Sequence, residues 1–176
     1  MLTDAGADMG ILAVSNQKGG VGKTTTAINV LALLGLAGKK CVLIDLDSQA
    51  NATTGLGMEK VDAPDLENGF SRPVATEYEG LYVVPASPMY ASAAVSNLLA
   101  RAVDSFELEG YDVAAFDCPP AMTGVTRAAL NVADSVIVPI QCEYFSLEGL
   151  ESVLRAMDVA RRQRNPDLKL LGILLT

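Results

Sequence analysis

Two lysines and three glycines lie within one short stretch of the chain that could grip a phosphate group. Residues 17–24 read QKGGVGKT. This is the phosphate-loop pattern G-x-x-x-x-G-K-[ST], with Gln17 where the first glycine is expected. Glycines have no Cβ, so the backbone can curl until several N–H groups reach one anion. The start of a following helix would point its own N–H groups at the same anion. The stretch therefore predicts a polyphosphate site.

The residue types in this motif suggest a role for each side chain. Lys23 would neutralise the terminal phosphates, and the Thr24 hydroxyl would ligate Mg²⁺. Lys18 adds a second cation at the mouth of the cradle. The nucleotide-binding residues are predicted to be Lys18, Gly19, Gly20, Val21, Gly22, Lys23, Thr24 and Thr25. The chain has no histidine, so any hydrolysis would depend on carboxylates, lysines, backbone dipoles and Mg²⁺.

Two aspartates follow the second apolar run of the chain. Asp45 and Asp47 are two residues apart, which places them on the same side of a strand end. Carboxylates beside a phosphate site can hold Mg²⁺ through water and position an attacking water molecule. An equally good interpretation is structural, with Asp47 capping the loop and Asp45 pairing with Lys23. The residues alone leave both interpretations open.

Two further strand ends carry polar side chains. Asp117 ends an apolar run and precedes Cys118 and two prolines, an arrangement in which the acid reaches Mg²⁺ through its water shell. Gln141 and Glu143 follow the next apolar run. For these two, a polar loop that caps the next helix, with Ser146 as the cap, is favoured over direct catalysis.

Alternating apolar runs and helical patterns must position these side chains. Strands are predicted over residues 11–15, 41–46, 81–84, 111–117, 135–140 and 170–175, and helices over 23–36, 89–103, 125–132 and 147–163. Most strand candidates are continuously apolar, which is typical of parallel strands covered on both faces. The fold class is therefore predicted to be α/β, a doubly wound, mostly parallel sheet with helices on both faces. Ligands of such folds bind at the carboxyl ends of the strands.

The length of 176 residues predicts one domain. Residues 1–10 are expected to be a flexible lead, and residues 11–176 to form the P-loop domain. The polar stretch 58–80 is expected to be irregular. The run 170–175 is expected to be a buried, central strand, and because almost nothing follows it, the domain is expected to be incomplete at its C-terminus.

The composition favours a soluble globular domain over other classes of protein. Half of the residues are apolar and 19% are charged, which favours a large core over disorder. The formal charge of −8 disfavours a nucleic-acid surface on this chain.

A late cluster of Arg155, Arg161, Arg162 and Arg164 is interpreted as a solvated helix end. No apolar run is long enough to cross a bilayer. Cys41, Cys118 and Cys142 lie far apart, which suits a reducing cytosol.

Taken together, the motifs resemble those of the ParA/Soj branch of the ParA–MinD family of deviant Walker ATPases. The matching segments occur in family order between about residue 11 and the C-terminus. They are NQKGGVGKTTT at 16–26, VLIDLDSQANATTGLG at 42–57, FDCPP at 116–120 and ADSVIVPIQCEYFSLEGL at 133–150. The resemblance implies a P-loop NTPase fold that binds ATP and Mg²⁺, with weak, partner-stimulated hydrolysis of ATP to ADP and phosphate.

The resemblance also implies roles for individual residues. Lys18 matches the signature lysine that reaches the partner's nucleotide in an ATP-dependent homodimer, and Lys23 matches the P-loop lysine. Asp47 matches the switch I aspartate that organises hydrolysis, so the implied catalytic set is Lys18, Lys23 and Asp47. The implied metal set is Thr24, Asp47 and the Walker B acid Asp117. Apposed lysines repel each other without a bound phosphate, so ATP would switch the protein between monomer and dimer.

Partners and location follow from the same resemblance. The expected partners are a second copy of the chain, a ParB-like stimulating protein and nonspecific DNA, the last through a region mostly absent from this chain. No membrane is expected. The protein is expected to act in chromosome or plasmid partitioning, to be cytoplasmic, and to associate with the nucleoid when ATP is bound.

The chain departs from the family pattern at two places. Ser48 stands where the family usually has proline, and residues 121–125 read AMTGV where it usually has SLGLL. Three other functions remain open. A MinD-like positioning ATPase would need a C-terminal amphipathic helix. A metabolic P-loop enzyme of the amidoligase type would need its own substrate pocket. The last alternative is an inactive fragment.

Overall fold

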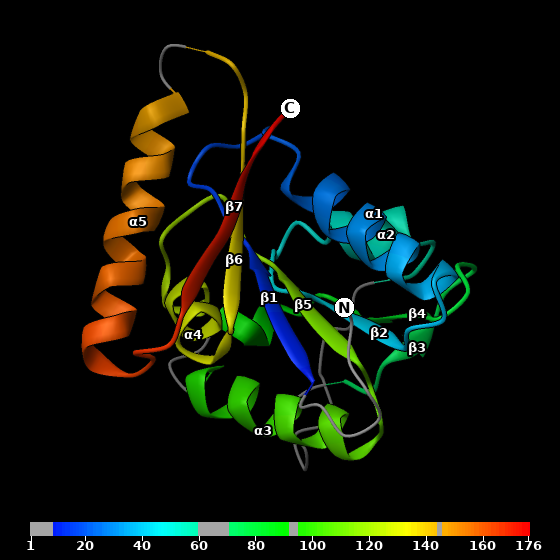
Figure 1. Cartoon of the computed structure of the whole chain (residues 1–176). Helices are drawn as coiled ribbons and strands as arrows, with labels where there is room; N and C mark the ends of the chain where they lie inside the picture. Colours follow the sequence, from blue (N-terminus) through cyan, green and yellow to red (C-terminus); the bar gives the residue numbers. More distant parts are fainter. Residues whose placement is uncertain (1–8, 60–70, 92–94, 144–145) are drawn as a thin grey trace.

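The computed structural model describes residues 9–59, 71–91, 95–143 and 146–176, and Figure 1 shows one sheet flanked by helices. The strands are β1 (Gly10–Val14), β2 (Cys41–Asp45), β3 (Val74–Ala75), β4 (Leu81–Val84), β5 (Val113–Asp117), β6 (Ser135–Ile140) and β7 (Lys169–Leu175). The helices are α1 (Lys23–Leu36), α2 (Asn51–Gly55), α3 (Val95–Leu108), α4 (Gly124–Val132) and α5 (Ser146–Gln163), with a 3-10 turn at Pro88–Ala91. Every pair of neighbouring strands is parallel except β3 and β4.

The strand order is β3-β4-β2-β5-β1-β6-β7, so the chain crosses the sheet in both directions from β1. This confirms the predicted doubly wound fold. The central strands β2 and β5 are buried along nearly all of their length, β1 is buried over its last three residues, and the three strands are parallel. Their carboxyl ends therefore meet at one edge of the sheet, where β1 leads into the phosphate loop and Asp45 lies opposite Asp117.

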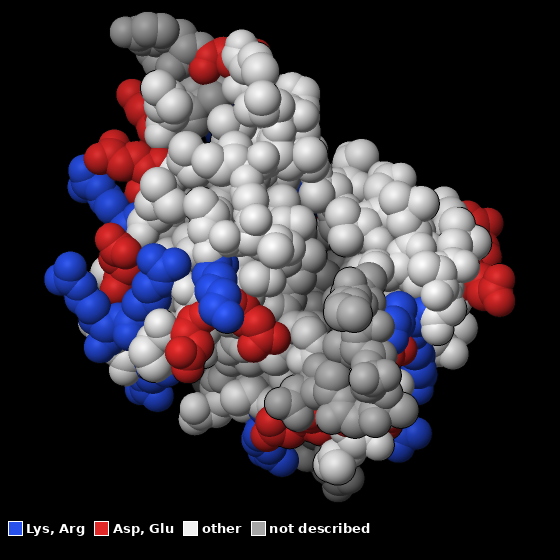
Figure 2. Space-filling view, in the orientation of Figure 1, with Lys and Arg blue, Asp and Glu red and all other residues white. Residues whose placement is uncertain are grey.

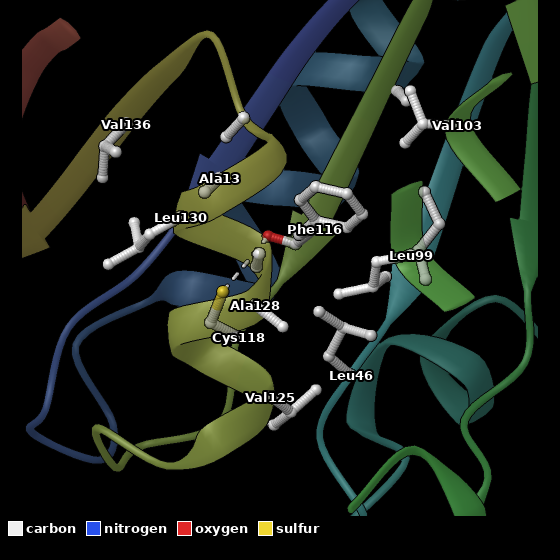
Figure 3. Close-up of a cluster of buried hydrophobic side chains, with 14 of the residues drawn as sticks. Ala13, Leu46, Leu99, Val103, Phe116, Cys118, Val125, Ala128, Leu130 and Val136 are labelled. Carbon is white, nitrogen blue, oxygen red and sulfur yellow. Dashed lines mark hydrogen bonds between the residues drawn. The ribbon is translucent and has the colours of Figure 1, made fainter. Parts of the chain in front are cut away.

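Each face of the sheet has its own apolar core, because successive side chains of a strand point to opposite faces. On one face, Leu12 and Val14 of β1 pack with Leu31 of α1. On the other face, Ala13 of β1 and Phe116 of β5 pack with residues of α3, α4 and α5. Figure 3 shows this second core, in which side chains from α3 and α4 surround the Phe116 ring. The two cores fix the strand ends from both sides.

The predicted elements mostly match the observed ones, and α1, β4 and β6 have the predicted bounds. The helix predicted over 89–103 is wrong at its start, because Pro88–Ala91 form a 3-10 turn and α3 begins at Val95. Neither α2 nor β3 was predicted, since both are too short to show a periodic pattern. Of the stretch predicted to be irregular, residues 60–70 lie outside the described residues, as do residues 1–8 of the predicted lead.

The prediction for the last strand is half wrong. β7 is a strand, but it lies at the edge of the sheet, and its apolar side chains are exposed rather than buried. Leu171 is 64% exposed and Leu175 is 65% exposed. The physical reason is that, among the described residues, β7 pairs only with β6, and of its apolar side chains only Leu170 packs against one of the two buried cores. Within the same residues, no helix is long and apolar enough to span a membrane.

Candidate nucleotide site

The loop between β1 and α1 forms an open cradle at the carboxyl edge of the sheet. Gly20 and Gly22 have φ angles of 73° and 81°, a backbone region that side chains with a Cβ rarely adopt. Gly22 is the N-cap of α1, and the first turn of α1 contains no acidic residue and no side-chain cap. The positive end of the helix is therefore not neutralised by its own residues.

A cavity of about 460 Å³ lies beside this cradle. Its lining brings together the phosphate loop, the segment after β2 and the segment after β5. The lining residues are Gly19, Gly20, Gly22, Lys23, Thr24, Thr25, Asp47, Gln49, Asn51 and Pro120. Most residues of the predicted nucleotide set therefore line one cavity. Lys18 does not line it and faces a neighbouring cavity with Gln17, while Val21 is buried.

Lys23 is held by the backbone of its own loop. The residue is 7% exposed, and its Nζ donates a hydrogen bond of 2.9 Å to the Lys18 carbonyl oxygen. Burial lowers its pKa, although the carboxylates of Asp117 and Asp47 act in the opposite direction. Among the described residues no carboxylate lies within ion-pair distance of Lys23. The ammonium is thus available for an anion in the cradle.

Asp45 is a structural carboxylate. It is fully buried, and its Oδ2 accepts hydrogen bonds from the Thr53 N–H at 2.8 Å and the Thr53 hydroxyl at 2.7 Å. Its Oδ1 accepts a third hydrogen bond, of 3.1 Å, from the Asp47 N–H. The interpretation that Asp45 pairs with Lys23 is therefore wrong. These contacts instead hold α2 and the loop after β2 in place.

Asp47 lines the cavity and also shapes its own loop. Its Oδ1 accepts a 3.0 Å hydrogen bond from the Gln49 N–H, which is the loop-capping contact foreseen for it. The residue is 8% exposed and shares the cavity with Lys23 and Thr24. Capping therefore leaves Asp47 facing the site, and its role in hydrolysis stays a prediction.

Asp117 ends β5 beside the start of α1. Its Oδ2 accepts a 2.7 Å hydrogen bond from the Thr24 hydroxyl, while its Oδ1 is buried and accepts no hydrogen bond from the described residues. Burial raises the pKa of this carboxyl to about 7, against the effects of the Thr24 hydrogen bond and the Lys23 charge. A buried carboxylate oxygen normally has a partner. The orphaned oxygen beside a hydroxyl fits a hard cation such as Mg²⁺.

The donor set is small, as a magnesium nucleotide site requires. No group of three or more Cys, Asp or Glu side chains among the described residues could hold a metal ion alone. Mg²⁺ usually binds through one or two protein groups, with substrate phosphates and water completing its shell. Thr24 and Asp117 would supply that share, with Asp47 nearby in the same cavity.

The loop after β6 contacts the cradle, which the sequence reasoning missed. Gln141 Nε2 donates a 3.1 Å hydrogen bond to the Gly20 carbonyl oxygen, and Glu143 Oε2 forms a 2.5 Å ion pair with Lys18 Nζ. These residues were expected to cap the next helix with Ser146, whose side chain lies outside the described atoms. The sequence placed Gln141 and Glu143 at the end of an apolar strand, but only the pairing of β6 with β1 shows that this strand ends near the phosphate loop.

The two departures from the family pattern meet at a second cavity. Ser48 lies with Thr123, Gly124 and Val125 in the lining of a cavity of about 220 Å³ next to the nucleotide cradle. Leu46, Ser87 and Pro119 complete the lining. The unusual residues are therefore neighbours in space although they are far apart in the chain.

The late arginine cluster is largely exposed, and two of its four members pair with acids. Arg155 pairs with Glu151 at 2.6 Å, and Arg161 pairs with Asp158 at 3.6 Å while also donating to the Leu168 carbonyl oxygen. Figure 2 shows basic and acidic atoms interspersed on the side of the molecule where α5 lies. In that view basic side chains gather near the lower end of α5 with acidic side chains among them, and this mixture agrees with a solvated helix end.

Known proteins share both the sequence and the fold of this chain. A family model described as an AAA domain matches residues 9–170. The chain is 40% identical to the sporulation initiation inhibitor protein Soj of Bacillus subtilis, covering 94% of the chain and 72% of Soj. It is 42% identical to the chromosome-partitioning ATPase Soj of Thermus thermophilus, covering 94% of the chain and 68% of that protein.

Solved structures also resemble this chain over nearly its whole length. Cobyrinic acid a,c-diamide synthase from Mycobacterium smegmatis, with bound ADP and magnesium, has a TM-score of 0.84 and 35% identity, covering 95% of this chain and 74% of that one. A plasmid partition protein from Borrelia burgdorferi has a TM-score of 0.76 at 24% identity, covering 96% of this chain and 79% of that one. The second likeness supports the fold alone.

The sequence relatives cover 94% of the chain, and the range of the family model includes the phosphate loop, the Asp47 segment and the Asp117 strand end. The structural neighbours reproduce the parallel sheet that brings these three segments together. The resemblance inferred from the motifs is confirmed on both grounds, and the chain belongs to the ParA/Soj family of partitioning ATPases.

Proposed function

We propose that this chain binds ATP with Mg²⁺ in the cavity between the phosphate loop, Asp47 and Asp117, and hydrolyses the nucleotide to ADP and phosphate. The observation that carries the proposal is the orphaned Asp117 Oδ1, buried beside the Thr24 hydroxyl at the foot of the phosphate loop. A related protein of 35% identity was crystallised with ADP and magnesium. Both observations support a magnesium nucleotide as the ligand.

Each residue then has a distinct task. Lys23 exchanges its hydrogen bond to the Lys18 carbonyl oxygen for the terminal phosphates, and backbone N–H groups of the loop bind the remaining phosphate oxygens. Thr24 and Asp117 would hold a magnesium ion, and this ion would supply positive charge to offset the charge that develops on the phosphates. Asp47 orients the water that attacks the γ-phosphorus.

Lys18 completes the site of a second copy in this proposal. It lies at the outer rim of the loop with 34% of its side chain exposed, so it can reach beyond its own chain. An ammonium supplied by a partner would stabilise the transferring phosphoryl group as an arginine finger does. ATP would thereby link hydrolysis to the change between monomer and homodimer.

The biological setting is proposed from the relatives. Several of them are named as chromosome-partitioning proteins, among them ParA of Myxococcus xanthus at 42% identity. We assign this chain to chromosome or plasmid partitioning in the cytoplasm, with a ParB-like protein and nonspecific DNA as partners. Nucleoid association would depend on bound ATP, and imaging a fluorescent fusion with and without Lys23→Ala tests that dependence.

The nucleotide proposal is tested by size-exclusion chromatography with light scattering. Wild-type protein should dimerise with ATP and Mg²⁺, but not with ADP or without nucleotide. Lys23→Ala should lose ATP binding by more than about 100-fold, because a buried cation in the cradle is removed. Lys18→Ala should bind ATP but stay monomeric, and Asp47→Ala should accumulate as the ATP-bound dimer. Unchanged ATP affinity in Lys23→Ala contradicts the site.

A second candidate function comes from the synthase that the structure resembles. Its likeness, at a TM-score of 0.84, favours an ATP-dependent amidation as the alternative. Turnover assays with cobyrinic acid and an ammonia donor distinguish the two. Partitioning predicts that ATP turnover responds to a ParB-like protein and DNA and ignores cobyrinic acid.

A further inference from the structure

The phosphate loop is tied to the loop after β6 at two points. Gln141 binds the Gly20 carbonyl oxygen at 3.1 Å, and Glu143 binds the Lys18 ammonium at 2.5 Å. The carbonyl oxygen of Gln141 also accepts a 2.8 Å hydrogen bond from the Glu143 N–H, which fixes the turn between them. A carboxylate is therefore held beside the rim of a cradle that is otherwise built for anions.

We propose that Glu143 is a positioning residue for Lys18: it holds the Lys18 ammonium against its own chain, so that Lys18 reaches a partner's nucleotide only after this ion pair opens. The proposal rests on the proposed function, because it assigns a regulatory contact to the same site. It goes further by naming the group that sets how readily an ATP-bound monomer becomes a dimer.

The backbone of Lys18 is fixed, but its side chain is free to change partner. The Lys18 N–H donates to Asn16 Oδ1 at 3.0 Å, and the Lys18 carbonyl oxygen accepts from Lys23 Nζ at 2.9 Å. The side chain lines a separate, open cavity with Gln17, Glu148 and Gly149. Lys18 can therefore leave Glu143 by side-chain rotation alone, without any movement of the loop.

The two positions of Lys18 exclude each other. One ammonium cannot pair with Glu143 in its own chain and also reach a nucleotide in the partner. The Lys18 and Glu143 side chains are 34% and 58% exposed, and an ion pair in water is weak. Each subunit must open one such pair before it dimerises. Compared with a chain that lacks the pair, the dimer association constant should therefore be lower by about 3- to 30-fold in total. The contact therefore raises the ATP concentration needed for dimers without preventing them.

The first test compares Glu143→Gln with Glu151→Gln. Both variants lose one negative charge near α5, but Glu151 pairs with Arg155 rather than with Lys18. Dimer association is measured by sedimentation with Mg²⁺ and the slowly hydrolysed analogue AMPPNP. Glu143→Gln should raise the association constant by about 3- to 30-fold, whereas Glu151→Gln and the charge-retaining Glu143→Asp should stay near wild type. An unchanged or lower constant in Glu143→Gln overturns the proposal.

The second test does not depend on dimers. Lysines of the nucleotide-free protein are acetylated and followed by mass spectrometry, with the exposed Lys169 as the internal reference. Lys18 should react about 2- to 5-fold faster in Glu143→Gln, because its amine is no longer held by a carboxylate. An equal Lys18 rate overturns the proposal. If all variants stay monomeric with AMPPNP, the dimer function fails, while acetylation still decides whether Glu143 holds Lys18.

Discussion

Asp45 and Asp117 lie opposite each other at the ends of neighbouring parallel strands, yet their carboxylates differ in the hydrogen bonds that they accept. Both are buried, at 0% and 1% exposed. Asp45 accepts three hydrogen bonds from its own neighbourhood, two of them from Thr53. Asp117 accepts one, from Thr24, and leaves its other oxygen without a partner. The fold satisfies the Asp45 carboxylate, whereas Asp117 keeps one oxygen that the proposed Mg²⁺ would complete.

In this chain, hydrogen-bond partners distinguish a buried carboxylate that the fold satisfies from one that a ligand could complete. Position at a strand end, burial and charge are the same for both residues. The two carboxylates differ in the number of hydrogen bonds that they accept. A buried polar atom that has no hydrogen-bond partner requires an explanation. Asp47 is intermediate, because one oxygen caps its loop while the residue still lines the nucleotide cavity.

The largest effect is expected from Asp45→Ala. The change leaves two backbone N–H groups and the Thr53 hydroxyl without their buried acceptor. Since each such loss costs about 1–3 kcal/mol, we expect the free energy of unfolding to fall by about 4 kcal/mol. Urea unfolding followed by circular dichroism measures it, with Asp104→Ala, at an exposed position of α3, as the control. If the free energy of unfolding falls no further in Asp45→Ala than in Asp104→Ala, Asp45 does not stabilise the fold as proposed.

The next effect is a dependence of stability on pH. The pKa of Asp117 is about 7 in the folded chain against an ordinary value of 3.8. Folded Asp117 therefore keeps a proton that the unfolded chain loses, so its stabilising contribution is full below pH 4 and is lost as the pH rises toward 7. Without Mg²⁺ and nucleotide, the free energy of unfolding should fall by about 2–3 kcal/mol between pH 5 and pH 8.

Two observations sharpen this pH prediction. Asp117→Asn should flatten the profile, because the amide does not titrate. Burial also raises the pKa of Asp45, in spite of its hydrogen bonds from Thr53, so a smaller slope of the same sign should remain. A full slope in Asp117→Asn would assign the titration to another group.

Asp117→Asn should separate binding from stability. The amide removes a buried charge, so the free energy of unfolding at pH 8 should not fall. The Mg²⁺-dependent affinity for ATP should drop by about 10- to 100-fold, as expected when a group that supports a metal is lost. Isothermal titration calorimetry with and without Mg²⁺ measures it. Equal affinities for wild type and variant would show that Asp117 does not serve the metal.

The smallest effect is expected from Thr53→Val. This hydroxyl donates to Asp45 at 2.7 Å and accepts from the Ala86 N–H at 2.8 Å. Its loss should lower the free energy of unfolding by about 1–2 kcal/mol and leave ATP affinity within about twofold of wild type. Thr54→Val, at the exposed next position, is the matched control. A large loss of ATP affinity would place Asp45 and its partners in the site itself.

The local patterns of the sequence predicted the part of the site that is contiguous in the chain. The loop after β1, the bounds of α1 and the strand end at Asp117 all depend on neighbouring residues, so their positions were predicted correctly, while the ligand roles of these residues stay predictions. Asp45 and Asp47 could not be separated, because two-residue spacing is the same whichever of them faces the ligand. Their difference depends on Thr53, which the unpredicted α2 brings to Asp45.

Contacts between segments that are distant in the chain could not be predicted from the sequence. The Lys18–Glu143 ion pair joins residues 125 positions apart, and no local pattern encodes it. The strand β7 was recognised from its apolar residues, but its exposure depends on which strands lie beside it. The periodicity of apolar residues identifies the face that a strand could bury. Whether that face is buried depends on the elements that pack against it in the folded chain.

The open side of β7 has a practical consequence for handling this protein. The strand exposes Leu171, Ile173, Leu174 and Leu175 along an edge that no other described strand covers. Unpaired peptide groups next to apolar side chains are a template for intermolecular strand pairing. Concentrated solutions of this 176-residue chain should therefore aggregate whether or not nucleotide is present, and a charged residue in place of Ile173 should make the chain more soluble.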